Sequence, residues 1–195
     1  MRLGLTGGMG CGKSFVLSCF AAQGWLTVET DAITRDLLAN DPEVARDLRE
    51  LFGDGVFDTD GRVDRAALAG LVFGDDAALR FLEGALHPRV RKVWLAAVDS
   101  ARDADVIVEI PLLFEKNLEK LFDLNVCVSA SLSTQIERLA RRGFGKNEAL
   151  ARMARQLPLR DKELRADFVI SNNGNPEFAR TQVTELIGRI AHRFA

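Results

Sequence analysis

A glycine-rich stretch near the start of the chain carries the clearest chemical signature. Its pattern, Gly7-x-x-x-x-Gly12-Lys13-Ser14, combines glycines, a lysine and a hydroxyl at fixed spacing. Glycines let backbone N–H groups converge on phosphate oxygens at the start of a helix, where the helix dipole also favours an anion. The lysine ammonium can meet β/γ phosphates, and the serine hydroxyl can ligate Mg²⁺. The pattern therefore predicts a nucleotide site.

Two carboxylates are candidates for the group that accepts a proton from an attacking hydroxyl or holds a Mg²⁺-bound water. Asp31 comes just after an apolar segment over 26–29, and Glu109 ends a similar segment over 105–110. Ligands of open α/β folds bind at the carboxyl ends of strands, which favours Asp31, whereas an acid that closes a strand beside a phosphate loop favours Glu109. By position alone, Asp31 could equally cap the helix that follows it.

The stretch from Arg138 to Arg165 is strongly cationic. It holds nine Lys or Arg residues and three acids, a net charge of +6. Arginines can neutralise charge as a phosphoryl group moves, and a hinged segment can bring them in after a nucleotide binds. Gly143-Phe144-Gly145 offers such a hinge, and helical spacing places Arg138 and Arg142 on one face. The alternative is a solvated, arginine-rich helix face.

These residues require strands and helices that place them. Short apolar segments over 3–6, 26–29, 105–110, 124–128 and 168–170 have the character of buried parallel strands. A helix over 13–23 follows the glycine-rich loop, so the first connection is expected to be a right-handed parallel crossover. In the cationic segment, helices are expected over 134–142 and 147–155, and a closing helix runs to about residue 193. The pattern predicts an α/β, doubly wound parallel sheet.

Residues from Asp31 to about Asp103 show helical rather than strand patterns. Asp41 with Pro42 predicts a helix start, and Asp64 predicts the cap of a helix over 66–73. A longer helix from Ala77 is expected to break at His87-Pro88 and then resume, because a proline disfavours the helical conformation of the residue before it. This part is predicted to be a mostly helical insertion.

The composition narrows the class of protein. The chain has 195 residues, 47% apolar, with a net charge of −2, which argues against a protein that binds nucleic acid over its whole surface. No signal-peptide pattern or membrane-length apolar run occurs, and a cytoplasmic location is expected. Cys11, Cys19 and Cys127 have neither disulfide nor zinc spacing and are expected to be buried thiols. The large aromatics Phe15, Phe20, Trp25 and Trp94 are expected in the core.

Taken together, these motifs resemble the dephospho-coenzyme A kinase family over nearly the full chain. The resemblance rests on Leu5 to Ser14, Glu29-Thr30-Asp31-Ala32, Leu86-His87-Pro88, Pro111-Leu112-Leu113-Phe114-Glu115, Gln135-x-x-Arg138-x-x-x-Arg142, Gln156, and Ala166-Asp167 leading to Asn172-Asn173-Gly174. The chain departs from the family pattern at Glu29, where Asp is usual, at Cys11, where Ser is usual, and at Phe15, where Thr is usual. None of these departures removes a group that the mechanism needs.

The resemblance implies a P-loop kinase-like fold, a doubly wound parallel sheet with a helical substrate-binding insertion and a helical lid. The implied nucleotide-binding core covers 1–30, 104–137 and 166–195. The coenzyme-binding insertion would cover 31–103 and the lid 138–165. The implied reaction transfers the γ-phosphoryl group of ATP to the ribose 3′-hydroxyl of dephospho-coenzyme A, with Mg²⁺ as cofactor, and no nucleic acid, membrane or obligate protein partner is expected.

The resemblance also implies roles for individual residues. The implied catalytic residues are Asp31 as base, with Lys13 and Arg142 as charge stabilisers. The implied ATP-binding residues are Gly8, Met9, Gly10, Cys11, Gly12, Lys13, Ser14, Phe15, Arg138 and Asn173, with Ser14 as the metal ligand. The implied substrate-binding residues are Thr6, Asp31, His87, Leu112 and Glu115.

Two alternatives remain open from the sequence. One is another small-substrate kinase, such as a nucleoside monophosphate or shikimate kinase, which a substrate panel would separate. The other is a nucleotide switch that binds partners instead of turning over. The sequence contains no Asn-Lys-x-Asp guanine-reading motif, and a lid with paired arginines is of little use to a switch, so enzymatic phosphoryl transfer is favoured.

Overall fold

The computed structural model describes residues 1–102 and 104–194, so Asp103 and Ala195, which fall within the predicted segments, lie outside the described residues. The chain divides into two compact units. One consists of Met1–Glu29 and Ala101–Ala195, and the other is the continuous stretch Thr30–Ser100.

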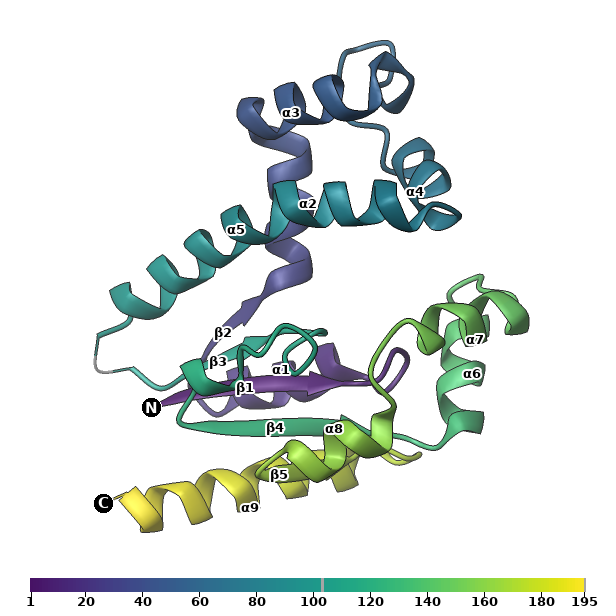
Figure 1. The fold of residues 1–195 in the computed structure, drawn as a ribbon. Helices are drawn as coiled ribbons and strands as arrows, with labels where there is room; N and C mark the ends of the chain where they lie inside the picture. The colour runs from purple at the N-terminus through teal and green to yellow at the C-terminus, as the bar shows by residue number, and fades with distance from the viewer. Residues whose placement is uncertain (103, 195) are drawn as a thin grey trace. The chain divides into compact units, whose positions relative to one another are not determined.

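The first unit is built on a five-stranded parallel sheet (Figure 1). The strands are β1 (Arg2–Gly7), β2 (Leu26–Glu29), β3 (Val106–Glu109), β4 (Leu124–Ser129) and β5 (Phe168–Ser171), in the order β2-β3-β1-β4-β5. All five predicted strands are present, and the α/β prediction is confirmed. Because β1 is central, the loop that follows it emerges between β3 and β4, where two neighbouring strands also end.

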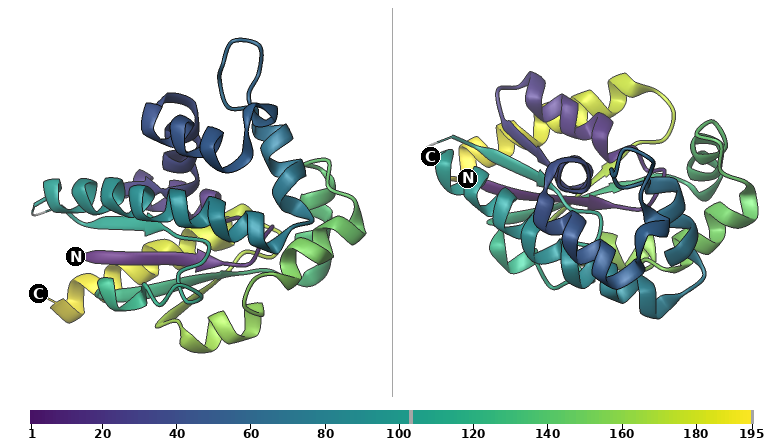
Figure 2. Two further views of the ribbon diagram at one scale, coloured as in Figure 1. Left: turned by 45° about the horizontal axis from the view of Figure 1, so that its top comes forward. Right: turned by 90° about the horizontal axis from the view of Figure 1, so that it is seen from above.

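Helices cover both faces of this sheet. The helices α1 (Lys13–Ala22) and α9 (Pro176–Phe194) lie together on one face, as the view from above shows (Figure 2). Leu3 and Leu5 of β1 face them and are fully buried with Phe20 of α1. Gly4 and Thr6 alternate to the opposite face of β1. Burial on both faces of the central strands β1, β3 and β4 explains why these strands consist of continuous apolar runs.

The cationic stretch folds into three helices. These are α6 (Leu132–Ala140), α7 (Lys146–Ala154) and α8 (Leu159–Arg165). The sequence patterns predicted the first two and missed α8, whose seven residues are too few to show a helical period. α8 packs against β1 and β4. The short 3-10 helix η2 (Glu119–Leu121), which lies between β3 and β4, was also not predicted.

The regular elements of the second unit are helices, and an isolated antiparallel bridge joins Phe57 and Val63. The unit contains α2 (Thr30–Asn40), α3 (Pro42–Phe52), the 3-10 helix η1 (Asp54–Val56), α4 (Arg65–Phe73) and α5 (Asp76–Ser100). The predicted caps are present: Asp41 Oδ1 accepts from the Glu43 and Val44 amides, and Asp64 caps α4 in the same way. α5 packs against α2, α3 and α4, and Trp94 is buried as expected.

The predicted break at His87-Pro88 is wrong, because α5 runs without interruption through Pro88. A proline inside a helix removes one backbone hydrogen bond and crowds the carbonyl four residues earlier. The carbonyl that loses its N–H donor is that of Gly84, and the Arg89 side chain donates to the neighbouring Ala85 carbonyl at 2.8 Å. Its guanidinium also pairs with Asp47 of α3 at 2.7 Å. Tertiary contacts therefore keep the helix continuous where local propensity predicted an end.

Candidate active site

The glycine-rich loop joins β1 directly to α1, as predicted. Gly7 and Gly12 both have positive φ, 148° and 86°. A Cβ on Gly7 would lie 2.3 Å from the Val128 carbonyl oxygen, and one on Gly12 would lie 2.3 Å from Asn172 Nδ2. Real side chains do not approach so closely, so both positions require glycine for space as well as for backbone conformation. The loop is therefore packed into its shape by neighbouring elements.

Lys13 is the first residue of α1, and its side chain turns back over the loop. Its Nζ donates to the carbonyl oxygens of Gly7 and Gly8, each at 3.3 Å. Both distances are long for a charge-assisted hydrogen bond. These two contacts are therefore weak, and phosphate oxygens would be better partners for the ammonium than these carbonyls.

Arg138 supports the loop from α6. Its guanidinium donates to the Cys11 carbonyl at 3.1 Å, to the Gly10 carbonyl at 3.4 Å and to the Asn172 carbonyl at 2.9 Å. The structure thus brings this predicted residue directly to the predicted loop. These three carbonyls partly neutralise a charge that lies beside the phosphate-binding amides.

Asn172 and Gln135 were not predicted as site residues, although both belong to motifs quoted above. Asn172 is buried, and its Nδ2 donates to the Cys11 carbonyl at 2.8 Å. Gln135 is 3% exposed and donates to the Ala130 carbonyl at 2.8 Å. A Cβ on Gly8 would lie 2.9 Å from Gln135 Oε1. For Gln135, the available signal was a polar residue on the face of α6 that turns towards the core, whereas Asn172 follows β5 and has no such helical signal.

Four further residues that were predicted to bind ATP or stabilise charge are exposed or half-buried in the first unit. Ser14 is exposed at the start of α1, and the half-buried Phe15 ring lies 5.1 Å from the Arg180 guanidinium. Asn173 is exposed, and its Oδ1 accepts from the Ser131 amide at 2.7 Å. Arg142 is exposed in the turn after α6. Since α6 ends at Ala140, the helical spacing that predicted a common face with Arg138 does not reach Arg142.

Leu112 and Glu115 belong to the segment that follows β3, and Thr6 of β1 contacts this segment. Thr6 is fully buried, and its Oγ1 donates to the Pro111 carbonyl at 3.2 Å. Leu112 is half-buried. Glu115 Oε1 accepts from Lys162 Nζ at 2.8 Å and from the Leu157 amide at 2.9 Å. Glu115 Oε1 is thus bonded to groups of the protein itself, Lys162 and the Leu157 amide.

The remaining predicted residues lie at the start of the helical unit and on its longest helix. Asp31 is exposed in the first turn of α2, two positions after the last residue of β2. A carboxylate is favourable there because of the helix dipole. His87 is exposed on α5. The rival carboxylate, Glu109, is 4% exposed at the end of β3.

All three cysteines are buried and free, as expected. Burial raises the pKa of the Cys11 thiol, and it raises that of Cys127 to about 12. A raised pKa lowers the thiolate fraction at neutral pH, and the thiolate is the reactive form. We therefore expect iodoacetamide at pH 7.5 to label Cys11 far more slowly in the native protein than in denaturant, as measured by mass spectrometry. Equal labelling rates in the two states would contradict this expectation.

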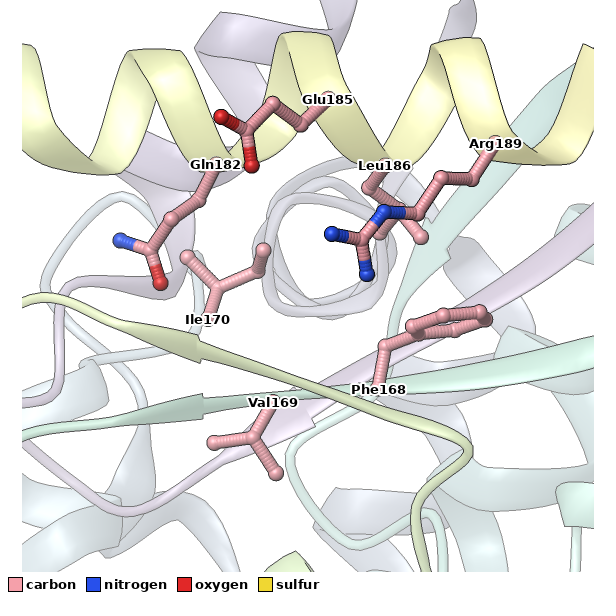
Figure 3. Close-up of a pocket in the computed structure, with 7 residues that line it drawn as sticks. All are labelled: Phe168, Val169, Ile170, Gln182, Glu185, Leu186 and Arg189. Carbon is pink, nitrogen blue, oxygen red and sulfur yellow. The ribbon is translucent and has the colours of Figure 1, made fainter.

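A separate cavity of about 180 Å³ lies between β5 and α9. Phe168, Ile170 and Leu186 line it together with Gln182, Glu185 and Arg189 (Figure 3). None of the predicted site residues lines this cavity. It is therefore distinct from the phosphate loop.

The residues present fit a Mg²⁺ ion that arrives with a nucleotide. Within 1–102 and 104–194, no group of three or more His, Cys, Asp or Glu side chains could hold a metal ion alone. Mg²⁺ usually keeps several waters and binds through substrate phosphates with one or two protein oxygens. The exposed Ser14 hydroxyl at the phosphate loop provides such an oxygen.

No helix of the described part is long and apolar enough to cross a membrane.

The family model and the curated relatives identify the family of this chain. A family model described as dephospho-CoA kinase matches residues 1–177. A dephospho-CoA kinase from Thermobifida fusca is 34% identical over 195 residues, covering 99% of this chain and 98% of the relative. The crystal structure of TT1252 from Thermus thermophilus has a TM-score of 0.82 at 34% identity, with 97% of each chain covered. Dephospho-CoA kinase from Campylobacter jejuni shares the fold, with a TM-score of 0.73 at 23% identity and coverage of 100% and 98%.

Proposed function

The chain belongs to the dephospho-CoA kinase family, and on that premise we propose how its residues carry out the reaction. The activity is ATP-dependent phosphorylation of dephospho-coenzyme A at the ribose 3′-hydroxyl, which gives coenzyme A and ADP in the last step of coenzyme A biosynthesis. The match of the family model over residues 1–177 carries this conclusion. The packed phosphate loop supplies the physical basis for nucleotide binding.

The roles of the individual residues are our proposal. Lys13 would release its weak contacts with the loop carbonyls and stabilise charge on the β/γ phosphates. Asp31 would accept the proton of the 3′-hydroxyl, and the exposed Arg142 would add positive charge as the phosphoryl group moves. Leu112 is proposed to line the acceptor site, and the substrate-binding role of His87 remains a prediction from the sequence.

The cofactor is proposed to be Mg²⁺, since kinases that act on ATP generally use it. When bound, it would neutralise charge on the β- and γ-phosphate oxygens. Ser14 would contribute the protein ligand. The cytoplasmic location, and the expectation of no further partner, remain predictions from the sequence.

We propose that only part of the segment 138–165 moves as a lid. Arg138 at its start is bound to loop carbonyls, and Lys162 near its end is fully buried in an ion pair. Between these two anchors lie Gly143, with φ 89°, and Gly145 at the start of α7. The moving part would therefore comprise about residues 143–156, with α8 belonging to the static core.

Hydrogen exchange tests the extent of this lid. Addition of a non-hydrolysable ATP analogue with Mg²⁺ should slow amide exchange in α7 and in the Gly143–Gly145 turn, because closure orders them. Amides of α8 should be protected in both states. Slowing confined to the phosphate loop would contradict a mobile lid, and exchange in α8 that changes together with α7 would contradict the proposed boundary.

The function itself is tested by ADP release from the purified protein. ATP, Mg²⁺ and dephospho-coenzyme A should give ADP and coenzyme A in equal amounts, whereas AMP or shikimate in place of dephospho-coenzyme A should give little. Preferred turnover of one of these substrates would indicate another small-substrate kinase. Nucleotide binding without turnover on any of them would favour a switch.

A further inference from the structure

Lys162 is the one lysine on the unpredicted helix α8, and its side chain is 0% exposed. Removing an ammonium group from water is costly unless close partners compensate for the lost hydration. Lys162 Nζ has two such partners, Glu115 Oε1 and the Pro111 carbonyl oxygen, each at 2.8 Å. A charge buried this completely fixes the position of whatever it contacts.

The partners of Lys162 connect four segments of the nucleotide-binding unit. The Pro111 carbonyl also accepts from Thr6 Oγ1, one residue before the phosphate loop begins. Glu115 Oε1 also accepts from the Leu157 amide, in the connection between α7 and α8. The ammonium thus joins β1, the segment after β3, the α7–α8 connection and α8 itself.

This arrangement fixes the segment Pro111–Glu115 at both ends. Lys162 holds the carbonyl at the start of the segment and the carboxylate at its end. Leu112, a residue we assign to the acceptor site, lies between these two points. The placement of its side chain therefore depends on an ammonium group that itself is buried away from solvent.

We propose that Lys162 is a positioning residue for the acceptor substrate, acting through the Pro111–Glu115 segment without touching substrate. The inference rests on the proposed function. Loss of the ammonium leaves the Glu115 carboxylate buried beside the Leu157 amide alone and frees the start of the segment. The acceptor then binds less well, while the phosphate loop keeps its own support from Arg138 and Asn172.

The test measures KM for each substrate in Lys162→Met. We expect KM for dephospho-coenzyme A to rise at least about tenfold, with KM for ATP changed by less than about twofold, because misplaced contacts weaken acceptor binding selectively. Glu163→Ala is the matched control on the same helix. Glu163 accepts a hydrogen bond from Ser129 of β4 at 2.5 Å, so its loss loosens α8 without freeing the Pro111–Glu115 segment. Both KM values of this control should stay within about threefold of the parent protein.

Equal rises in both KM values of Lys162→Met, or an unchanged KM for dephospho-coenzyme A, would overturn the proposal. So would a Glu163→Ala profile that matches that of Lys162→Met, since a general loosening of α8 would then suffice. If Lys162→Met does not fold, Lys162→Met/Glu115→Gln removes both charges and keeps an acceptor for the Leu157 amide. An acceptor KM within about twofold of the parent in that variant would also refute the proposal. Absence of dephospho-coenzyme A turnover in the parent protein would instead refute the proposed function.

Discussion

Replacement of Asp31 by Asn is expected to lower kcat by at least about 100-fold while changing the apparent affinity for dephospho-coenzyme A by less than about tenfold. General-base assistance is worth roughly 10²–10⁴-fold, and a loose phosphoryl-transfer transition state needs little early proton transfer, which favours the lower part of that range. Asn keeps the size and one hydrogen-bonding oxygen of Asp. The loss should therefore appear in kcat more than in KM.

The same substitution separates this role from a purely structural one. Asp31 stands in the first turn of α2, where a carboxylate favours the helix, and Asn would weaken that effect by only a fraction of a kcal/mol. Steady-state kinetics of Asp31→Asn and Glu109→Gln, compared at equal folded fraction, distinguish the two carboxylates. Near-normal turnover in Asp31→Asn together with lost turnover in Glu109→Gln would transfer the base assignment to Glu109.

Replacement of Lys13 by Ala is expected to lower kcat/KM by about 10²–10³-fold, equivalent to about 2.7–4 kcal/mol of transition-state stabilisation from one preorganised electrostatic contact. The loop should keep its shape, since Arg138, Asn172 and the tight packing around Gly7 hold it independently of the lysine. The effect should thus be chemical and not a consequence of unfolding.

Lys120→Ala provides the control for loss of a lysine. Lys120 is exposed in η2 and carries the same charge outside the phosphate loop. Its removal should leave kcat/KM within about twofold, and circular dichroism should show the same thermal unfolding for all three proteins within a few degrees. Turnover of Lys13→Ala within about threefold of the parent protein would exclude the proposed role of the lysine.

The sequence predicted those features that depend on neighbouring residues. The phosphate loop has a fixed spacing because its shape comes from consecutive glycines and the helix that follows. The five strands are apolar runs, and Asp41 and Asp64 cap their helices through side-chain geometry that spans three residues. Each of these signals depends on residues close together in the sequence, so each can be predicted without knowledge of the fold.

The features that the sequence did not predict depend on contacts between distant segments. Pro88 remains inside α5, which packs against α2, α3 and α4 and whose Arg89 pairs with Asp47, 42 positions away. The Asn172 side chain donates a hydrogen bond to the Cys11 carbonyl, 161 residues away in the sequence. Lys162 donates one to the Pro111 carbonyl, 51 residues away. Such polar residues resemble ordinary surface residues in the sequence, because only the folded chain shows that they are buried.

The central position of β1 has a consequence for synthesis of the chain on the ribosome. β1 is made first, but its neighbours in the sheet begin only at Val106 and Leu124. At roughly 5–20 residues per second, about 6–24 s pass before both are available. The helical unit Thr30–Ser100, whose contacts are local, is made entirely within that interval. Nascent chains should therefore contain a folded helical unit while the apolar β1 strand still has both edges unpaired and open to chaperones.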